Sequence, residues 1–553
     1  MSFLGRLFCS LMASSLLWAP SGGTSAWAQA VQADPLPAGG AGGAGTTLRV
    51  VMHSPLFSLD PLSSSAYITR DHGYLIYDTL FAVDAEGVVR PQMVDHWSVS
   101  EDGLAWQFTL RPDLLFHDSQ RVGSDDVVAS LKRWAARDAL GQKLFAQVRQ
   151  IEAIDPQSFR IRLSAPTGLM LDALGRSSSY PPFIMPARIA QTPPNVAITE
   201  FVGSGPFIFK ADEFEPNAKA VYVRFGRYRA RSEPPSGLAG GKVAKVDRIE
   251  WQVINDPQTA ARALLAGDID LIEQPSPSLI AELGAAPEVN LLRQNPLGNQ
   301  YALRFNSLLK PFNDARVRRA VMLALDQQAM LKAVHGDLGE YRPCKALFVC
   351  STPLASEAGF EGMLEGRTDE AKKLLEEAGY DGTPIVLLHA TDLKILAGLA
   401  PEAKAQLERA GFKVDMQSMN WQELVSRRNI KDGPEQNGWH AFFTSWAGAD
   451  VTHPVGTAFL NANCEHSILG WPCDPELEKL REAFALEARA ERREQMIEQI
   501  QKHFAQSPTH VHLGQWFRPM AVRSQVTGIV EAPVPVFWNI EKRAQQEATS
   551  PTK

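Results

Sequence analysis

Hydrophobic and polar positions between residues 106 and 134 follow a strand pattern, then a loop, then a helix pattern. Apolar and polar side chains alternate over 106–110, as in a strand with one buried face. A loop over 113–123 follows, and Ser124 is a good N-cap. Asp125 and Asp126 complement the helix dipole in the first turn. The apolar residues after them form one helical face: Val127, Val128, Leu131 and Trp134.

Strand-like and helix-like segments continue to alternate along the chain. The segments with strand character are 48–51, 159–163, 246–254, 385–389, 412–416, 442–446 and 515–522. The segments with helical periodicity include 257–266, 369–378, 402–410 and a long region at 475–505. Asp256 caps the first of these helices, and Gly267 stands just past its end. Elements of these lengths in this order predict mostly parallel α/β layers.

Length and composition limit the class of protein. The chain has 553 residues, which is too long for one hydrophobic core and indicates two or three domains. Its hydrophobic fraction of 45% and charged fraction of 21% are typical of a soluble globular protein. The formal net charge is −7 and no basic block is present, so nothing in the sequence predicts a nucleic-acid partner.

The N-terminal residues have the features of an export signal. Arg6 precedes an apolar run over 7–20, and Ala26-Trp27-Ala28 has the small-x-small form of a cleavage site. The run is shorter than the roughly 20 residues that cross a bilayer. We therefore expect a cleaved signal peptide at 1–28 and periplasmic localisation. The Gly- and Ala-rich residues at 29–45 are expected to form a flexible linker.

Four cysteines remain after such cleavage. An even number of cysteines in an exported chain favours disulfides. Short sequence separation favours the pairs Cys344–Cys350 and Cys464–Cys473, each worth roughly 2–3 kcal/mol in the chain-entropy model. A structural zinc site with four thiolates is the alternative, although the spacings differ from those of a zinc ribbon.

The sequence carries no HExxH, no GxSxG and no complete phosphate-binding loop. The segment GLAGGK at 237–242 lacks the full spacing and the following Ser or Thr, so we expect a surface loop there. His510 and His512 would share one strand face, but they have no obvious third ligand in sequence. We expect both imidazoles to be partly buried or to face solvent. We predict no catalytic residues, no metal and no cofactor.

An ordered set of residues around the strand at 106–110 and the helix that follows it resembles a known signature. The set is Pro91, Met93, Trp97, Asp102, Gly103, Trp106, Phe108, Leu110, Arg111, Phe116, His117, Asp118, Asp126 and Val127. This order resembles the signature region of family 5 solute-binding proteins, the extracytoplasmic receptors of peptide and nickel ABC importers. Ser119 departs from the pattern, because the family usually has Gly there. A second stretch similar to the family is NSLLKPFNDARVRRAVMLALD at 306–326.

The resemblance covers residues 46–540 and implies a fold. It implies an α/β protein with the bilobal type II periplasmic-binding-protein fold, in the large three-subdomain variety. Lobe I would comprise 46–297, with an extra subdomain at about 92–200 and a return segment at 514–540. Lobe II would comprise 298–513, and 541–553 would be a tail.

The resemblance also implies a function. A monomer would capture a small solute as its two lobes close, and the resemblance indicates that this solute is a di- or oligopeptide. It would deliver the solute to a membrane permease, while separate subunits hydrolyse ATP. Alternative ligands are a nickel chelate or another non-peptide such as an opine or oligosaccharide. An exported hydrolase is the alternative from a different class, and turnover of peptides would distinguish it.

Candidate ligand-binding residues follow from the same resemblance. Asp450 in TSWAGAD is the candidate anchor for a ligand ammonium, or else a loop-capping residue. Peptide receptors of this type usually place that aspartate three residues after the tryptophan, where this chain has Ala449. Trp446 is expected either to line the site or to belong to the core. The other candidates lie on loops expected to face the cleft or near the return crossover: Asp392, Trp471, Phe57, Tyr77 and Trp516.

Overall fold

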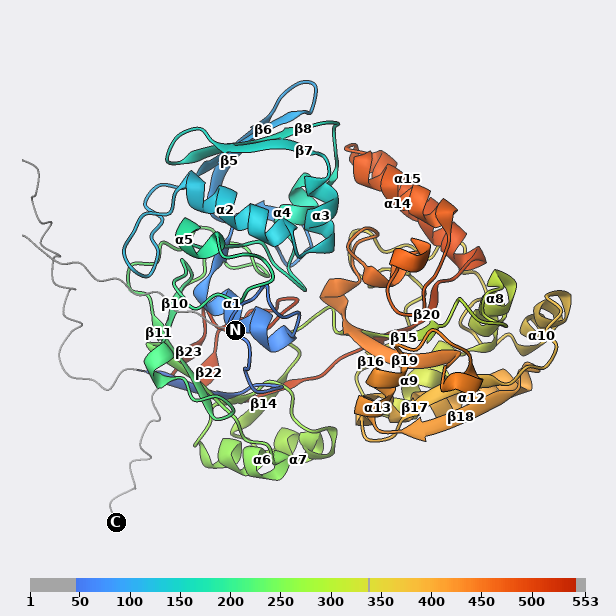
Figure 1. The fold of residues 1–553 in the computed structure, drawn as a ribbon. Helices are drawn as coiled ribbons and strands as arrows, with labels where there is room; N and C mark the ends of the chain where they lie inside the picture. Colours follow the sequence, from blue (N-terminus) through green and yellow to red (C-terminus); the bar gives the residue numbers. More distant parts are fainter. Residues whose placement is uncertain (1–45, 337–338, 544–553) are drawn as a thin grey trace, which may run out of the picture. The chain divides into compact units, whose positions relative to one another are not determined.

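The computed structural model of the protein describes residues 46–336 and 339–543 (Figure 1). The expected signal peptide at 1–28, the linker at 29–45 and residues 544–553 of the expected tail lie outside the described residues. Within the described ranges, no helix is both long and apolar enough to cross a membrane.

A seven-stranded sheet contains the first strand of the fold. Its order is β10 (Phe207–Phe209), β11 (Lys219–Arg224), β12 (Arg248–Gln252), β1 (Thr47–Val51), β13 (Leu271–Ile272), β21 (Met520–Arg523) and β14 (Val289–Leu292). β1 pairs in parallel with β12 and β13, and the other neighbours pair antiparallel.

Helix α6 (Pro257–Ala266) packs on this sheet and has the boundaries that its sequence predicts. The Asp256 side chain accepts a hydrogen bond from the Thr259 N–H at 2.8 Å. Gly267 ends the helix with φ of 85°, a left-handed conformation that suits a residue without Cβ. Leu264 is buried in one cluster with sheet residues, so the apolar face of the helix closes one side of the sheet.

A separate four-stranded sheet carries the signature stretch. Its order is β5 (Val94–Val99), β6 (Ala105–Leu110), β8 (Ser158–Leu163) and β7 (Val148–Ala153). Helix α2 (Ser124–Ala135) buries Leu131 and Trp134 in the same core. The prediction that Ser124 caps this helix was wrong by one residue. Gly123 is the N-cap, and its N–H donates to Asp126 at 2.8 Å, because the Ser124 hydroxyl bonds to the Asp155 carbonyl.

A six-stranded sheet is built from the later part of the chain. Its order is β16 (Tyr341–Arg342), β20 (His510–Trp516), β15 (Asn299–Phe305), β19 (Ala441–Ala447), β17 (Ile385–Ala390) and β18 (Val414–Met419). β17 pairs in parallel with β18 and β19, whereas β15 pairs antiparallel with β19 and β20. The prediction of mostly parallel layers was therefore wrong, because apolar patterns do not specify the direction from which a distant strand arrives.

The remaining helices and several short strand pairs lie around these sheets (Figure 1). The earlier helices are α1 (Tyr67–Ile76), α3 (Ala139–Phe145), α4 (Leu169–Leu174), α5 (Ala187–Ala190) and α7 (Ile280–Ala285). The later ones are α8 (Ala315–Ala324), α9 (Gln327–His335), α10 (Thr368–Glu377), α11 (Lys394–Ala397), α12 (Leu399–Arg409), α13 (Trp421–Arg427), α14 (Pro475–Leu486) and α15 (Ala490–Gln506). The short pairs are β2 (Asp78–Thr79) with β9 (Phe183–Ile184), β3 (Phe81–Val83) with β4 (Val89–Pro91), and β22 (Val526–Thr527) with β23 (Glu541–Lys542).

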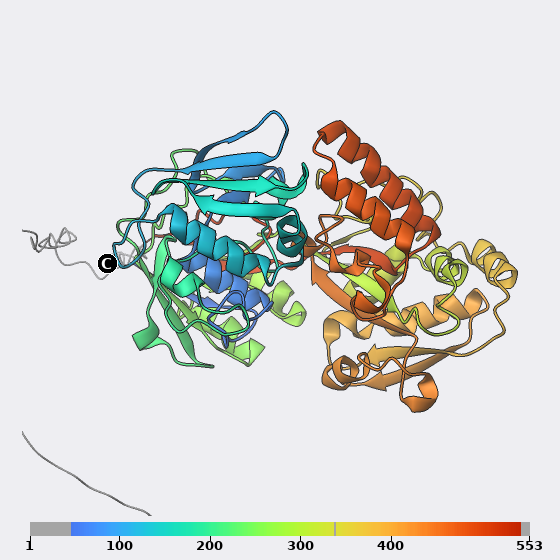
Figure 2. The same ribbon diagram turned by 45° about the horizontal axis from the view of Figure 1, so that its top comes forward.

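Two predicted elements are each divided in the structure. The helical region at 475–505 is two helices, α14 and α15, which lie side by side (Figure 2). The strand predicted at 515–522 is split between β20 and β21, which belong to different sheets. The chain therefore crosses between sheets at 517–519, and it makes the opposite crossing between β14 and β15.

Gly298 lies in the crossing between β14 and β15, and its surroundings show that the passage is tight. Its φ is 58°, and a Cβ at this position would lie 2.5 Å from the Trp516 carbonyl oxygen.

We call the part built on the seven- and four-stranded sheets the first lobe. The part built on the six-stranded sheet is the second lobe.

Candidate ligand-binding site

A cavity of about 530 Å³ is lined by both lobes. We call it the large cavity. Its volume is within the range of small-molecule sites in proteins. The first lobe contributes residues from 83–89, 167–178 and 531–533, and the second from 351–354, 449–453 and 488–494.

Asp450 links the two lobes beside this cavity. Residues Gly448–Asp450 form a single 3₁₀ turn after β19, and this turn directs the Asp450 side chain toward the first lobe. Its carboxylate accepts a hydrogen bond from the Tyr67 hydroxyl at 2.8 Å and another from the Ser179 hydroxyl at 2.9 Å. The Tyr67 oxygen in turn accepts from the Ala447 N–H at 3.0 Å. Asp450 is only 4% exposed.

Tyr67 acts as a donor toward Asp450. Burial, followed by the charge of Asp450, raises the pKa of Tyr67 well above its ordinary value. The phenol therefore keeps its proton at neutral pH. The Arg70 guanidinium lies over the Tyr67 ring, 4.7 Å from its centroid, which fixes the ring from the first lobe.

A second link between the lobes lies in the lining of the large cavity. Asp172 on α4 accepts hydrogen bonds from Arg493 on α15 and from His453 Nε2, the latter at 3.0 Å. His453 Nδ1 accepts from two backbone N–H groups at 3.2 Å, so the ring hydrogen is on Nε2. Burial lowers the pKa of His453. Burial also opposes ionisation of Asp172, but His453 and Arg493 outweigh it and lower the pKa of this carboxyl.

Backbone groups form a third link at the end of α14. The Ala485 carbonyl accepts from the Thr167 hydroxyl at 2.7 Å and from the Gly168 N–H at 3.1 Å. Carbonyls in the last turn of a helix have no partner within the helix, so the first lobe supplies one here. A Cβ on Gly168 would lie 2.0 Å from the Glu487 carbonyl oxygen, so only glycine allows this approach.

Charges that line the large cavity are unevenly matched. Arg176 lies 2.7 Å from Asp138, and Arg493 is paired with Asp172, so both arginines already have carboxylate partners. Glu494 and Glu531 line the same cavity and, among residues 46–336 and 339–543, make no ion pair. The charges left for a ligand are therefore negative.

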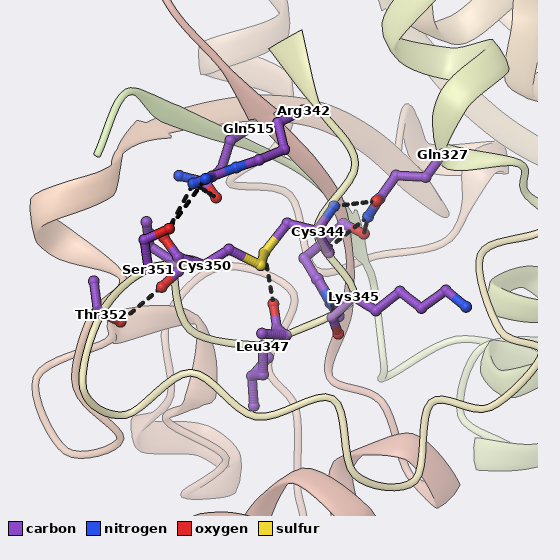
Figure 3. Close-up of a disulfide and its surroundings, with 12 residues drawn as sticks. Gln327, Arg342, Cys344, Lys345, Leu347, Cys350, Ser351, Thr352 and Gln515 are labelled. Atoms are coloured by element: carbon purple, nitrogen blue, oxygen red, sulfur yellow. Dashed lines mark hydrogen bonds between the residues drawn. A yellow bond between two sulfur atoms is a disulfide. The ribbon is translucent and has the colours of Figure 1, made fainter. Parts of the chain in front are cut away.

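A disulfide holds one loop of the cavity wall (Figure 3). Cys344 and Cys350 are bonded, with an S–S distance of 2.06 Å. Arg342 donates to the Ser351 hydroxyl and to the Cys350 carbonyl, both at 3.1 Å. Residues 351–354 then line the cavity. The expected Cys464–Cys473 bond is also present, so all four cysteines are in disulfides and the zinc alternative is excluded.

A smaller cavity of about 70 Å³ is lined by Tyr67 and Ala447, the two residues bonded to each other beside Asp450. We call it the small cavity. Ser178 and Ala449, which are the chain neighbours of Ser179 and Asp450, line the large cavity instead. The Asp450 contact therefore lies between the two cavities.

Potential metal ligands gather beside the small cavity, but they are already engaged. One nitrogen or oxygen atom of each of His53, Asp71 and Glu273 lies within 4.8 Å of the others. His53 Nδ1 is 2.7 Å from Glu273, and Arg70 donates to one oxygen of Asp71. Burial raises the pKa of Asp71 to about 6, although Arg70 opposes this change. A metal here would have to displace both partners.

The two histidines of β20 are core residues. His510 and His512, expected to be partly buried or to face solvent, are 1% and 0% exposed. That expectation was wrong, because Phe504 on α15 packs against both rings, with centroids 5.1 Å from His510 and 6.0 Å from His512. His512 Nε2 donates to the Lys345 carbonyl at 2.9 Å, and burial lowers the pKa of His512 to about 4.

Two of the other candidates lie beside the Asp450 contact. Trp446, the residue before Ala447, is half-buried, with its ring 4.4 Å from that of Phe459. Trp516 Nε1 donates to the Ser445 hydroxyl at 3.0 Å. These two tryptophans therefore pack around the end of β19, which leads into the turn that carries Asp450.

Four candidates lie elsewhere, and none of them lines either cavity. Trp471 is buried against Trp439 in the second lobe, and Tyr77 is fully buried in the first. Asp392 accepts from the Trp421 N–H at 2.7 Å, at the start of α13. Phe57 is 70% exposed.

The residues that sequence reasoning missed are those that link the lobes. Tyr67, Asp172, His453 and Arg493 lack a local motif, because each is defined by a partner hundreds of residues away. Only the pairing of β-strands and the two chain crossings bring them together.

Comparison with known proteins identifies the family. The model for bacterial extracellular solute-binding proteins, family 5 (middle), matches residues 88–466. The chain is also 34% identical, over 499 residues, to a probable peptide ABC transporter periplasmic-binding protein of Sinorhizobium fredii. That match covers 90% of this chain and 93% of the relative. The chain belongs to solute-binding protein family 5.

Other similar proteins have lower sequence identity to this chain. The glutathione-binding protein GsiB of Salmonella paratyphi A is 25% identical and covers 72% of this chain and 74% of its own. The structure of DppA from Helicobacter pylori in complex with the peptide STSA has a TM-score of 0.70 at 20% identity, covering 90% and 98% of the two chains. This likeness confirms the expected α/β periplasmic-binding-protein fold. As a family 5 member, the protein is the non-enzymatic substrate-binding component of an ABC importer, with a ligand and a permease as partners.

Proposed function

We propose that this family 5 protein captures a di- or oligopeptide in the large cavity and that Asp450 binds the α-ammonium group of the peptide. One observation carries the proposal. A carboxylate that is 4% exposed stands beside an interlobe cavity, and its hydrogen bonds to the other lobe come from hydroxyl groups. The similarity to a probable peptide-binding protein supports the choice of ligand class.

The chemistry of Asp450 favours a cationic partner. Within residues 46–336 and 339–543, no cation is in ion-pair contact with this carboxylate. Hydroxyl donors satisfy its oxygens without neutralising its charge. A buried unpaired charge is costly, and an entering ammonium group would supply the missing partner. The unmatched Glu494 and Glu531 add negative charge along the same cavity.

The end of β19 is held so that it can present Asp450. Trp516 bonds to Ser445, and Tyr67 bonds to Ala447, so the strand end is fixed from both lobes. We therefore assign Trp446 and Trp516 a positioning role around the anchor. The aspartate stands four residues after Trp446 because the intervening residues make a 3₁₀ turn.

Closure of the lobes would complete the transport cycle. A ligand shifts an open and closed equilibrium only if it binds the closed state more tightly. The contacts of Asp172 and Ala485 form only when the lobes meet, so they stabilise the closed state whether or not a ligand is bound. The exported monomer, freed of residues 1–28, would then present the closed form to its permease in the inner membrane.

Mass spectrometry of material that co-purifies with residues 29–553 tests the ligand class directly. Calorimetric titration with trialanine and with N-acetyltrialanine then tests the ammonium contact, because acetylation removes the positive charge. We expect trialanine to bind and its acetylated form to bind at least about tenfold more weakly. Equal binding of the two forms, or turnover of the peptide, would refute the proposal. Co-purification of a metal chelate or an opine would replace the ligand class.

A further inference from the structure

His453 stands where the second link between the lobes meets the loop that carries Asp450. It follows Asp450 by three residues, and its side chain is 13% exposed. Its Nε2 donates to Asp172 of the first lobe at 3.0 Å. Its Nδ1 accepts from the N–H groups of Val455 and Gly456, both at 3.2 Å. One imidazole therefore holds its own turn of the chain and also the contact with the other lobe.

The turn after His453 is fixed in the second lobe by contacts that do not involve the imidazole. Arg481 on α14 donates to the carbonyls of Pro454 and Val455, at 2.9 and 3.2 Å. Arg481 is itself paired with Glu478. The backbone N–H groups of the turn are therefore held toward Nδ1. A proton on this nitrogen would replace two hydrogen bonds by contacts between donors.

The charges around His453 also disfavour a proton on its ring. Asp172 lies at hydrogen-bond distance, but it is shared with Arg493 on α15. Arg176 lies against the same turn and is paired with Asp138 at 2.7 Å. Burial lowers the pKa of His453, and the charges of Arg493 and Arg176 add to this effect, whereas Asp172 opposes it. The closed form therefore favours the neutral imidazole.

We propose that His453 is a positioning residue that makes capture of the ligand sensitive to acid. The neutral ring fixes the loop of Asp450 and joins it to Asp172 of the first lobe. The protonated ring cannot accept from the turn, so it has to rotate toward water, and its contact with Asp172 is lost. The open form then becomes more populated and the ligand is held less tightly. This inference rests on the proposed function, because Asp450 is the anchor whose loop is positioned.

The direction of the pH effect follows from proton binding. In the open form the ring meets water and has its ordinary pKa of 6.5, whereas the closed form binds the proton less well. The preference for the closed form is therefore complete above pH 6.5 and is lost as the pH falls below it. A closed form that excluded the proton entirely would lower affinity about eightfold between pH 7.0 and 5.5. We expect a loss of about threefold to eightfold.

Calorimetry with trialanine at pH 7.0 and 5.5 tests this coupling in the wild type, H453N, H453Q and the control H96N. The asparagine oxygen can still accept from the turn, and the glutamine amide can still donate to Asp172, but neither side chain takes up a proton. His96 also has a carboxylate neighbour, Asp95 at 3.1 Å, but its side chain is 69% exposed.

The wild type and H96N should lose affinity by about threefold to eightfold at pH 5.5. H453N and H453Q should bind more weakly than the wild type at pH 7.0, because each lacks one half of the contact, and should lose nothing further at pH 5.5. The same loss at pH 5.5 in either variant would overturn the proposal.

A second arm needs no peptide. Small-angle scattering gives the radius of gyration of the unliganded protein at both pH values. The radius should be larger at pH 5.5 for the wild type and H96N, and unchanged for H453N and H453Q.

The two arms separate this inference from the proposed function. If trialanine does not bind but the radius responds through His453, the peptide proposal fails and the acid-sensitive contact stands. If the radius responds while the wild-type Kd is the same at both pH values, His453 does not position the anchor and its assignment is refuted. A wild-type radius that does not change with pH overturns the contact itself.

Discussion

Replacing Asp450 by Asn should change ligand affinity and stability in different directions. Asparagine has nearly the same shape, and its amide oxygen can still accept from Tyr67 or Ser179. In the liganded state, D450N removes the anion that pairs with the ligand ammonium. Loss of such a desolvated, charge-assisted contact costs about 2–3 kcal/mol, which is roughly a thirtyfold to two-hundredfold increase in Kd.

In the unliganded state, the same change removes a carboxylate that is 4% exposed and that, among residues 46–336 and 339–543, accepts hydrogen bonds from hydroxyl groups alone. Because an unpaired buried charge is costly, the free energy of unfolding should stay the same or rise by about 1 kcal/mol. A merely structural role for Asp450 predicts the opposite, since the amide keeps one acceptor oxygen and loss of the other hydrogen bond would then destabilise the protein.

Two measurements decide between these outcomes. Calorimetry with trialanine gives Kd, and urea unfolding without ligand gives the free energy of unfolding. D415N is the matched control, because Asp415 is an exposed strand residue whose side chain, within the described part of the chain, bonds only to Gln417. An unchanged Kd together with a stability loss of about 1 kcal/mol or more in D450N would refute the reasoning.

Three further outcomes follow from the other contacts. D172N removes the charge that holds His453 and Arg493 and so weakens this contact between the lobes. Small-angle scattering should then show a larger radius of gyration without ligand, and Kd should rise by about threefold to tenfold. An unchanged radius would contradict this prediction. Changing Cys344 and Cys350 to Ser should cost about 2 kcal/mol of stability and also weaken ligand binding, whereas loss of the second disulfide should affect stability alone. Burial lowers the pKa of His117 from 6.5 to about 4, so the unfolded state binds more protons in this interval. Stability should therefore fall by up to about 3 kcal/mol as pH drops from 6.5 to 4, and H117Q should reduce this slope in pH-dependent urea unfolding; an unchanged slope would exclude His117 as its source.

The sequence was informative where structure depends on neighbours in the chain. The alternation over 106–110 and the capping of α6 by Asp256 are local, and both appear in the structure as predicted. The disulfide pairings also followed from short separations. The family motifs extended this local information to the fold as a whole.

Long-range contacts were not visible in the sequence. Tyr67 and Asp450 are 383 positions apart, and nothing in either local pattern indicates the other. Burial was misjudged for the same reason at His512, because the pattern of β20 does not reveal what covers it. Trp471 and Tyr77 are aromatic residues that the resemblance placed at the cleft, and the structure places them in the cores of the lobes.

The carbonyl of Ala485 gives the molecule its own reporter of lobe separation. Its hydrogen-bond partner, the Gly168 amide, belongs to the other lobe, so this proton is shielded only while the two halves touch. Once they part, water hydrates both groups and deuterium can replace the proton. The exchange rate of this single backbone site, followed with and without peptide, would therefore measure how often the protein opens, without any attached probe.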